Sequence, residues 1–338
     1  MNKRPLFSVI IFLFCTVFYF ASCKSDAGET KKTEAHTDSI STSVQDSLPA
    51  LLSDSAMLSS NNPVLLKFNP SPGKVYTITS SNKTTITNTG DGMPEQKPLR
   101  TETQVTFTMA VKNKSAQNKY TIELIQKNSR QTTAMGDEKM EYVSGRAMAD
   151  PQEDKMRQAL DCMINSPFIL TMNDDAEIEN ISGLENVKSK IRKIVGDSVP
   201  EEMIEVPDPS EEIENFFLTF PDSAVIVGST WKKKLSSAIQ GLPVSIINHY
   251  TVLERNNGMI TIEFKSNINI DKSQVPKEYQ EQLNAIKLAG TVNGTLLIEE
   301  STGWTMEVNA EQNIQISQEV QGQKASTNMK GVVTLRSL

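Results

Sequence analysis

Histidine and cysteine side chains are the residues of this chain that could supply nucleophiles, bases or metal ligands. His36 lies in a polar N-terminal stretch and His249 in a strand-like segment, and neither has a Cys or His partner at the spacing of a zinc site. Cys162 lies in a segment with helical apolar spacing, where a buried thiol behaves as a small hydrophobic side chain. The sequence has no Gly-rich phosphate loop and no Gly-x-Ser-x-Gly elbow. We therefore expect no metal, no cofactor and no enzymatic activity.

Acidic side chains gather in one segment that contains no basic residue. Between Val195 and Trp231 the acids are Asp197, Glu201, Glu202, Glu205, Asp208, Glu211, Glu212, Glu214 and Asp222. Such a cluster could bind calcium or a cationic partner, but its spacing does not match an EF-hand loop. We favour a solvated acidic surface.

Cys23 is the residue with the clearest predicted chemistry. Lys3 and Arg4 precede an uncharged, mostly apolar run from Leu6 to Phe20, and this layout is typical of a cleaved secretory signal rather than a membrane span. The small residues Ala21 and Ser22 then stand directly before Cys23, an arrangement that resembles a lipobox. The sequence therefore predicts a signal peptide over residues 1–22 and acylation of Cys23, for example with palmitate.

The net charge indicates which partners the chain can bind, and the number of cysteines indicates whether a disulfide can stabilise the fold. The chain has a net charge of −7, and removal of residues 1–22 takes away two bases and no acid, which leaves −9. An acidic chain lacks the basic surface that binds phosphate backbones, so we expect no nucleic-acid partner. The expected partner is a bilayer, reached through the acylated Cys23. Cys162 is then the one unmodified thiol, so the fold must be stable without an internal disulfide.

Residues 23–62 have the composition of a disordered tether, rich in Ser, Thr and Asp. The tether holds three Asp-Ser-aliphatic triplets, each eight residues after the previous one. This triplet resembles an O-glycosylation site of Bacteroidota, which makes Ser39, Ser47 and Ser55 candidate sites; chance occurrence in an Asp- and Ser-rich segment is an equal alternative. Two later triplets, at Ser198 and Ser223, are expected to be less accessible.

From residue 63 onward the sequence predicts a mainly β region, residues 63–338, with a few helices. Val105, Phe107 and Met109 alternate with polar residues, and similar runs over 74–87, 120–124, 231–237, 243–254, 259–270, 291–299, 303–317 and 325–336 predict long strands. Shorter strands are expected over 64–68, 131–135, 139–144 and 168–172, with a return strand around 178–181. Asn256-Asn257-Gly258 is typical of a hairpin turn.

Four helices are expected among these strands. Asp150 with Pro151 predicts the start of the first, and Leu184 to Ile194 has the apolar spacing of a second. Two more are predicted around Ser210–Phe220 and from Pro276 to Ile286. For a set of central side chains we favour ordinary core packing; the alternative is that, if the helices lie on a curved sheet, these side chains line an apolar groove between helices and sheet. These candidates are Met135, Met140, Met156, Met163, Met172, Phe216 and Phe217.

Four segments together resemble an uncharacterised domain family of Bacteroidota lipoproteins. They are Leu65–Tyr76, Phe168–Gly183, Phe220–Trp231 and Gly294–Val308. The resemblance implies long, curved antiparallel sheets, similar to the half-barrels of LolA/LolB-type lipoprotein carriers, with helices packed on the concave side. A weak echo between Gly73-Lys74-Val75-Tyr76 and Gly228-Ser229-Thr230-Trp231 suggests two similar halves, 63–195 and 215–338, joined by the acidic segment.

These features together predict a lipoprotein anchored in the bacterial envelope, at the outer membrane, with the membrane face left open. The expected function is non-enzymatic binding of an apolar ligand or of an envelope protein. The alternative is a structural or accessory subunit of a cell-surface or outer-membrane complex.

Overall fold

The strands of this chain form one large antiparallel sheet. The computed structural model describes residues 62–338 except 93, 95, 197–205, 207–215, 219, 240–241, 276–279, 281–282 and 321. The strands are β1 Val75–Gly90, β2 Leu99–Lys114, β3 Tyr120–Met135, β4 Glu138–Val143, β5 Pro167–Met172, β6 Ile178–Ser182, β7 Thr230–Ile239, β8 Leu242–Asn256, β9 Met259–Ile270, β10 Ile286–Glu299, β11 Trp304–Val320 and β12 Gln323–Ser337. Their order in the sheet is β6-β5-β3-β2-β1-β12-β11-β10-β9-β8-β7, and β4 pairs with β3.

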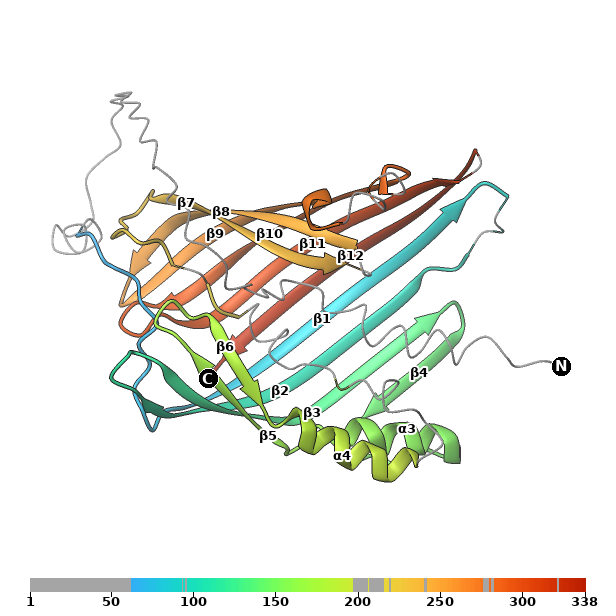
Figure 1. Cartoon of the computed structure of the whole chain (residues 1–338), viewed down its shortest axis with the longest axis horizontal. Coiled ribbons are helices and arrows are strands. Elements are labelled where there is room, and N and C mark those ends of the chain that lie inside the picture. The colour runs from blue at the N-terminus through green and yellow to red at the C-terminus, as the bar shows by residue number, and fades with distance from the viewer. Residues whose placement is uncertain are drawn as a thin grey trace.

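The β1–β12 ladder joins the two predicted halves into a single sheet. Its register runs from Ile78 opposite Ser337 to Gly90 opposite Ala325. The sheet curves into a trough (Figure 1). The trough is open because, among the described strands, β7 at one margin pairs only with β8 and does not meet β6 at the other. The expectation of a curved, half-barrel-like antiparallel sheet is therefore confirmed.

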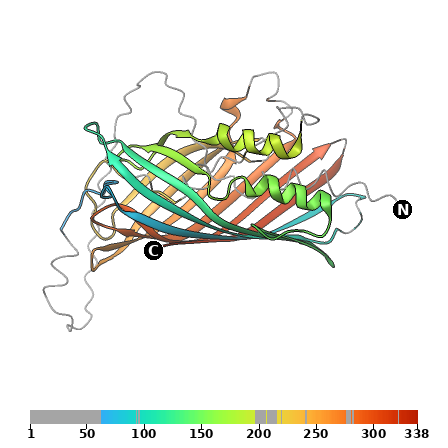
Figure 2. The same cartoon turned by 90° about the horizontal axis from the view of Figure 1, so that it is seen from below.

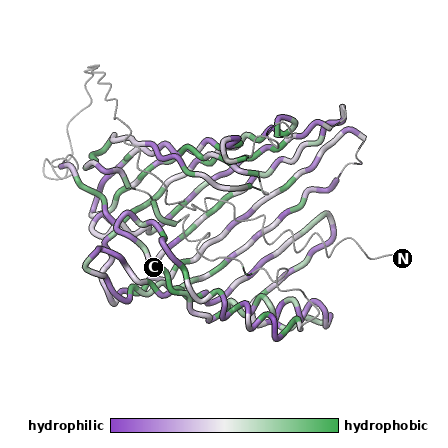
Figure 3. Tube along the Cα trace, viewed as in Figure 1, coloured by the Kyte–Doolittle hydropathy of each residue, from purple (hydrophilic) through white to green (hydrophobic). Residues whose placement is uncertain are grey.

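Alternation of side chains gives the sheet two different faces. On β2, Val105, Phe107 and Met109 are buried, whereas Gln104 between the buried positions is exposed. The same exchange of apolar and polar residues runs along most strands (Figure 3). We call the face that carries Phe107 the inner face; it lies toward the helices, and a single apolar core covers much of it.

Two helices lie on the concave side, along the β3 and β5 margin (Figure 2). Helix α3, Pro151–Asp161, starts as predicted: the Asp150 carboxylate accepts from the backbone N–H groups of Gln152, at 2.8 Å, and Glu153, at 3.1 Å. Helix α4, Leu184–Val195, also matches its prediction and buries Val187. A 3₁₀ turn, η2 Lys272–Gln274, follows β9, and the described residues Gln280 and Leu283 are helical, within the range of the fourth predicted helix.

Some local predictions were wrong. Residues 64–68 do not form a strand apart from a bridge between Val64 and Val225; they cross the end of the trough, where Leu66 and Phe68 are fully buried in the core. Residues 131–135 are the end of β3 rather than a separate strand. Ile286 begins β10 instead of ending a helix, because its neighbours pair with β11. Most of the helix predicted around 210–220 lies outside the described residues.

Candidate functional site

An uninterrupted apolar row crosses the inner face of the sheet. The register places these side chains opposite one another on nine neighbouring strands, from β3 to β7: Met135, Leu99, Ile86, Met329, Ile314, Gly290, Ile268, Ile246 and Leu235. Because opposite residues in a ladder share a face, all eight side chains point into the trough. Gly290 has no side chain, and the side chains of Ile314 and Ile268 occupy the space beside it: a Cβ at Gly290 would stand 3.1 Å from Ile314 and 3.3 Å from Ile268.

A second row, two residues further along each strand, is mostly polar. We call it the polar belt; its members are Thr133, Thr101, Thr84, Gln312, Ser266 and Asn248, with Gly331 and Val292 at the two positions between. Every polar member from β3 to β8 is uncharged, and on β7 the row continues to Lys233, opposite Asn248. Thr101, Thr84 and Ser266 are buried, which sets the belt apart from ordinary surface threonines and serines.

Hydrogen bonds tie part of the belt together across three strands. The Thr84 hydroxyl donates to Asn82 Oδ1 at 2.9 Å, and Gln312 Nε2 reaches Thr84 Oγ1 at 3.5 Å from β11. Gln312 crosses β12 at Gly331, where an added Cβ would stand 2.5 Å from Gln312 Nε2. Gly331 is therefore what leaves room for the Gln312 side chain to reach Thr84.

Other polar atoms in or near the belt lack a hydrogen-bond partner among the described residues. Thr101 and its neighbour Thr103 are 3 % and 6 % exposed, and among the described residues neither hydroxyl has a hydrogen-bond partner. On β8, Asn248 Nδ2 donates to the Tyr250 hydroxyl at 2.9 Å, while its Oδ1 has no partner in the described part of the chain. Buried polar atoms are nearly always paired, so such exceptions need an explanation.

An aromatic cluster closes one end of the trough. Tyr76 stacks on Trp304 with ring centroids 3.6 Å apart, and Phe68 and Phe217 pack against the same indole. Trp304 Nε1 donates to Ser337 Oγ at 2.9 Å, which satisfies its one polar atom. This end is therefore filled with protein side chains.

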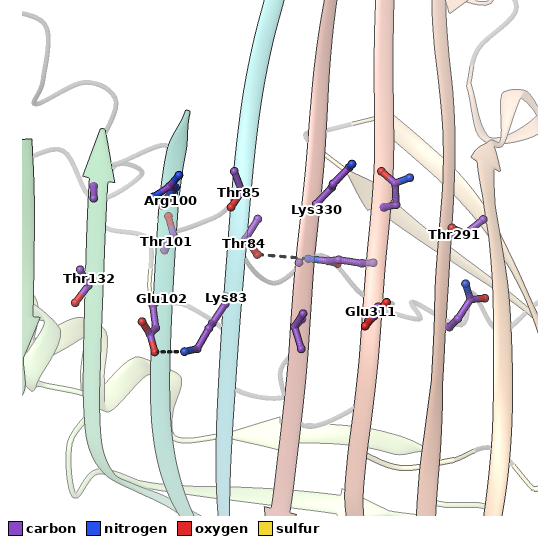
Figure 4. A pocket seen from close by; sticks show the side chains of 16 residues that line it. Lys83, Thr84, Thr85, Arg100, Thr101, Glu102, Thr132, Thr291, Glu311 and Lys330 are labelled. Carbon is purple, nitrogen blue, oxygen red and sulfur yellow. Dashed lines mark hydrogen bonds and ion pairs between the residues drawn. The ribbon is translucent and has the colours of Figure 1, made fainter. Parts of the chain in front are cut away.

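The outer face carries a wide, shallow hollow of about 850 Å³ over the middle of the sheet (Figure 4). Lys83 and Glu102 form an ion pair at 2.9 Å on its floor. Arg100 and Lys330 stand on either side of Thr85, one strand away in each direction. Charges of both signs, with Thr and Asn between them, make this hollow hydrophilic.

The seven predicted groove residues do not form one groove. Met163, Met172 and Phe216 are buried in the core, and Phe217 joins the aromatic cluster. Met172 pairs with Tyr120 at the start of β3, whereas Met135 ends that 16-residue strand, about 50 Å away. Met135 belongs to the apolar row and is 44 % exposed. Met140 lies opposite Thr133 at the end of the polar belt, and Met156 lies on α3.

The predicted modification sites Cys23, Ser39, Ser47 and Ser55 lie outside the described residues, as do Ser198 and the acids from Asp197 to Glu205 and from Asp208 to Glu214. Asp222 and Ser223 are both exposed. The Ser223 triplet, expected to be less accessible than those of the tether, is therefore open to solvent. It is open because residues 221–224 form an exposed bend before the Val225 bridge.

The described His, Cys, Asp, Glu and Ser side chains can be compared with the requirements of metal and nucleophile sites. No group of three or more His, Cys, Asp or Glu side chains within them could hold a metal ion. Burial raises the pKa of the Cys162 thiol, which opposes thiolate formation. Lys190 Nζ donates to Ser166 Oγ at 2.8 Å, but that hydroxyl donates its own proton to the Cys162 carbonyl at 2.7 Å. A serine nucleophile would have to give its proton to a base, so this pair is better described as a polar tie between α3 and α4.

No helix in the described part of the chain is long and apolar enough to cross a bilayer.

Comparison with known proteins gives one partial family match and several distant structural likenesses. The model of the Family of unknown function (DUF6263) matches residues 208–305. No curated protein matches the chain. A structure described as lipid–protein interactions in lipovitellin is similar over 79 % of this chain, with 13 % identity and a TM-score of 0.45; the match covers 25 % of the lipovitellin chain.

Two further solved structures are less similar to this chain. The translocator domain of autotransporter NalP from Neisseria meningitidis shares 10 % identity over 78 % of this chain and 88 % of its own, with a TM-score of 0.20. Pseudomonas aeruginosa OpdK with vanillate shares 7 % identity over 78 % of this chain and 98 % of its own, with a TM-score of 0.11. These identities and TM-scores are too low to transfer a function, so the function is argued from the residues of this chain.

Proposed function

We propose that this protein is a non-enzymatic binding protein that holds an apolar ligand on the inner face of its curved sheet. The observation that carries the proposal is the apolar row, which crosses nine strands without one polar side chain. Within the described part of the chain, α3 and α4 lie along the β3 and β5 margin, away from the inner face of β9 to β12 (Figures 1 and 2).

The central side chains of the row, Met329, Ile314, Ile268 and Ile246, are at most 6 % exposed, and such an enclosed apolar lining suits a hydrocarbon chain better than a polar substrate. Burial of apolar area contributes about 25 cal/mol per Å², so a ligand that buries about 200 Å² against such a surface gains about 5 kcal/mol. Concave, mostly apolar sites with a few placed polar groups are the usual form of small-ligand sites. The arrangement supplies binding without any described nucleophile or base nearby.

Binding can be tested with the uncharged fluorescent probe N-phenyl-1-naphthylamine. Ile314→Thr places a hydroxyl in the middle of the apolar row and should weaken probe binding about fourfold, the effect of losing roughly one buried methylene. Asn313→Thr, one residue away on the outer face, is the matched control and should bind as the unchanged protein does. Circular dichroism checks that both variants fold.

A second measurement does not depend on a variant. The native protein, purified from the envelope in mild conditions, should release an acyl-containing molecule on organic extraction, detected by mass spectrometry. A protein that carries no such molecule and does not bind the probe would contradict the proposal.

We further propose that acylated Cys23 anchors this binding domain in the bacterial envelope, at the outer membrane. The proposal is supported by the apolar run and the small residues before the cysteine. Cells fed labelled palmitate should label the protein, and Cys23→Ala should lose both the label and membrane association. Labelled Cys23→Ala protein would show that the acyl group is elsewhere.

A second candidate function is that of an accessory subunit that binds another envelope protein through the outer hollow. The hollow supports this alternative, since charges of both signs over its floor could pair with a complementary surface. Cross-linking in intact cells should then capture a protein partner at this face. Arg100→Glu with Lys330→Glu should abolish the cross-link, whereas Lys287→Glu with Lys324→Glu, elsewhere on exposed strand positions, should leave it.

A further inference from the structure

We propose that the Thr101 and Thr103 hydroxyls form a hydrogen-bonding subsite for an uncharged carbonyl group, an ester or amide, of an acyl ligand lying in the trough. This inference rests on the proposed apolar binding function and adds the chemical class of the ligand. Its basis is a pair of buried hydroxyls that lack partners within the described residues.

The register fixes the position of both side chains. Thr101 lies between Thr84 and Thr133, and Thr103 lies between Asn82 and Gln131, so both point to the inner face. Two residues apart on one strand, their Cα atoms are about 7 Å from each other. Leu99, the next inner-facing residue of β2, belongs to the apolar row.

The neighbouring polar groups are already engaged with one another. Thr84 donates to Asn82 and accepts from Gln312, which reaches it over Gly331. The hydroxyls of Thr101 and Thr103 take no part in this network of hydrogen bonds. A buried hydroxyl without a partner costs about 1–3 kcal/mol in stability, and such exceptions to pairing are a reason to look for a missing ligand group.

The chemistry of the belt selects the ligand group. A threonine hydroxyl can donate one hydrogen bond, so two idle hydroxyls suit an acceptor such as a carbonyl oxygen. The inner-facing neighbours Thr84, Asn82, Thr133 and Gln131 are all uncharged, so a phosphate or carboxylate would be desolvated here without a counter-charge. An ester or amide carbonyl meets the donors, and its attached hydrocarbon can lie along the adjacent apolar row.

A matched pair of lipids tests the proposal. Monopalmitoylglycerol and 1-O-hexadecylglycerol have the same headgroup and chain length, but only the first has a carbonyl oxygen. Each is titrated against bound N-phenyl-1-naphthylamine. The unchanged protein should prefer the ester by about tenfold, the expected effect of one to two added hydrogen bonds.

Thr101→Val with Thr103→Val should remove that preference, so that the ester and the ether displace the bound probe equally well. Thr106→Val with Thr108→Val alters two outward-facing threonines of the same strand and is the matched control, expected to keep the tenfold preference.

Failure of the two ideas can be told apart. If the unchanged protein does not bind the probe, the apolar binding function itself is wrong. If the probe binds but ester and ether compete equally, the trough binds hydrocarbon and the carbonyl subsite is wrong. Retention of the ester preference in the Thr101→Val, Thr103→Val variant would also overturn the subsite.

Discussion

Gly303 shows how a single residue without a side chain holds the closed end of the trough together. Its φ of +66° is a conformation that side-chain-bearing residues rarely adopt. A Cβ at this position would stand 2.4 Å from the Lys67 carbonyl oxygen and 3.0 Å from the Phe220 ring. The glycine therefore allows the segment around Phe68 to lie directly against the turn before Trp304.

Gly303→Ala should accordingly destabilise the protein by about 3 kcal/mol, from left-handed strain together with the collision at Lys67. Gly228→Ala is the matched control: its φ is +87°, but nothing lies within 4 Å of the added Cβ, so only the strain of about 1–2 kcal/mol remains. Urea unfolding of the two variants measures the difference. Equal losses would show that the backbone around Lys67 yields at little cost.

Tyr250 makes the folded state sensitive to alkali. Burial raises the pKa of its phenol to about 12, from an ordinary value near 10. Between these values the unfolded chain loses the proton while the folded chain keeps it, so stability is full below pH 10 and falls as pH rises through 12. The loss amounts to about 3 kcal/mol at most.

Urea unfolding at several pH values between 9 and 12 checks this expectation. Tyr250→Phe should flatten the decline, although not abolish it, because burial also raises the pKa of Tyr76 and Tyr142. A decline of unchanged steepness in Tyr250→Phe would assign the alkaline sensitivity to other groups.

Among the elements, β7 lies at one margin of the sheet. Within the described residues it pairs with β8 alone. Lys232, Lys233 and Lys234 stand consecutively on it, the charge placement that discourages edge-to-edge pairing. This explains why a sheet with a long margin need not recruit a second copy.

Replacing all three lysines of β7 by Thr should promote self-association, because the edge then becomes a neutral, strand-forming template. Light scattering on a sizing column gives the mass. The same exchange at Lys287, Lys324 and Lys330, which lie on strands paired on both sides, controls for the change in net charge and should leave the mass unchanged. A monomeric β7 variant would mean that the edge is protected in another way.

The elements themselves were largely predictable from the sequence. Alternation identified the long strands because one face of each is buried, and the Asp150 cap identified the start of α3. The segment around Leu66 was misassigned because its apolar run fills the end of a core instead of pairing with neighbours. A short apolar run has the same appearance in both settings.

At the scale of the whole molecule, the inner-face rows could not be predicted. On β1 both faces are polar from Thr79 to Thr85, so alternation does not tell which of its threonines and serines point inward. Only the ladders with β2 and β12 show that Thr84, and not Thr85, belongs to the belt. The candidate groove residues lie far apart for a related reason, since closeness of methionines in sequence does not fix strand register.

The β1–β12 ladder has a consequence for how the molecule reaches its final form. It pairs Ile78 with Ser337, the first strand with the last, 259 residues apart. Contacts across such separations are slow to form, because a long loop must be ordered before they stabilise the chain. Until β12 emerges from synthesis, β1 and β11 both remain open edges. The two half-sheets can therefore join only once β12 has been synthesised, and the growing chain stays exposed to misassembly until then.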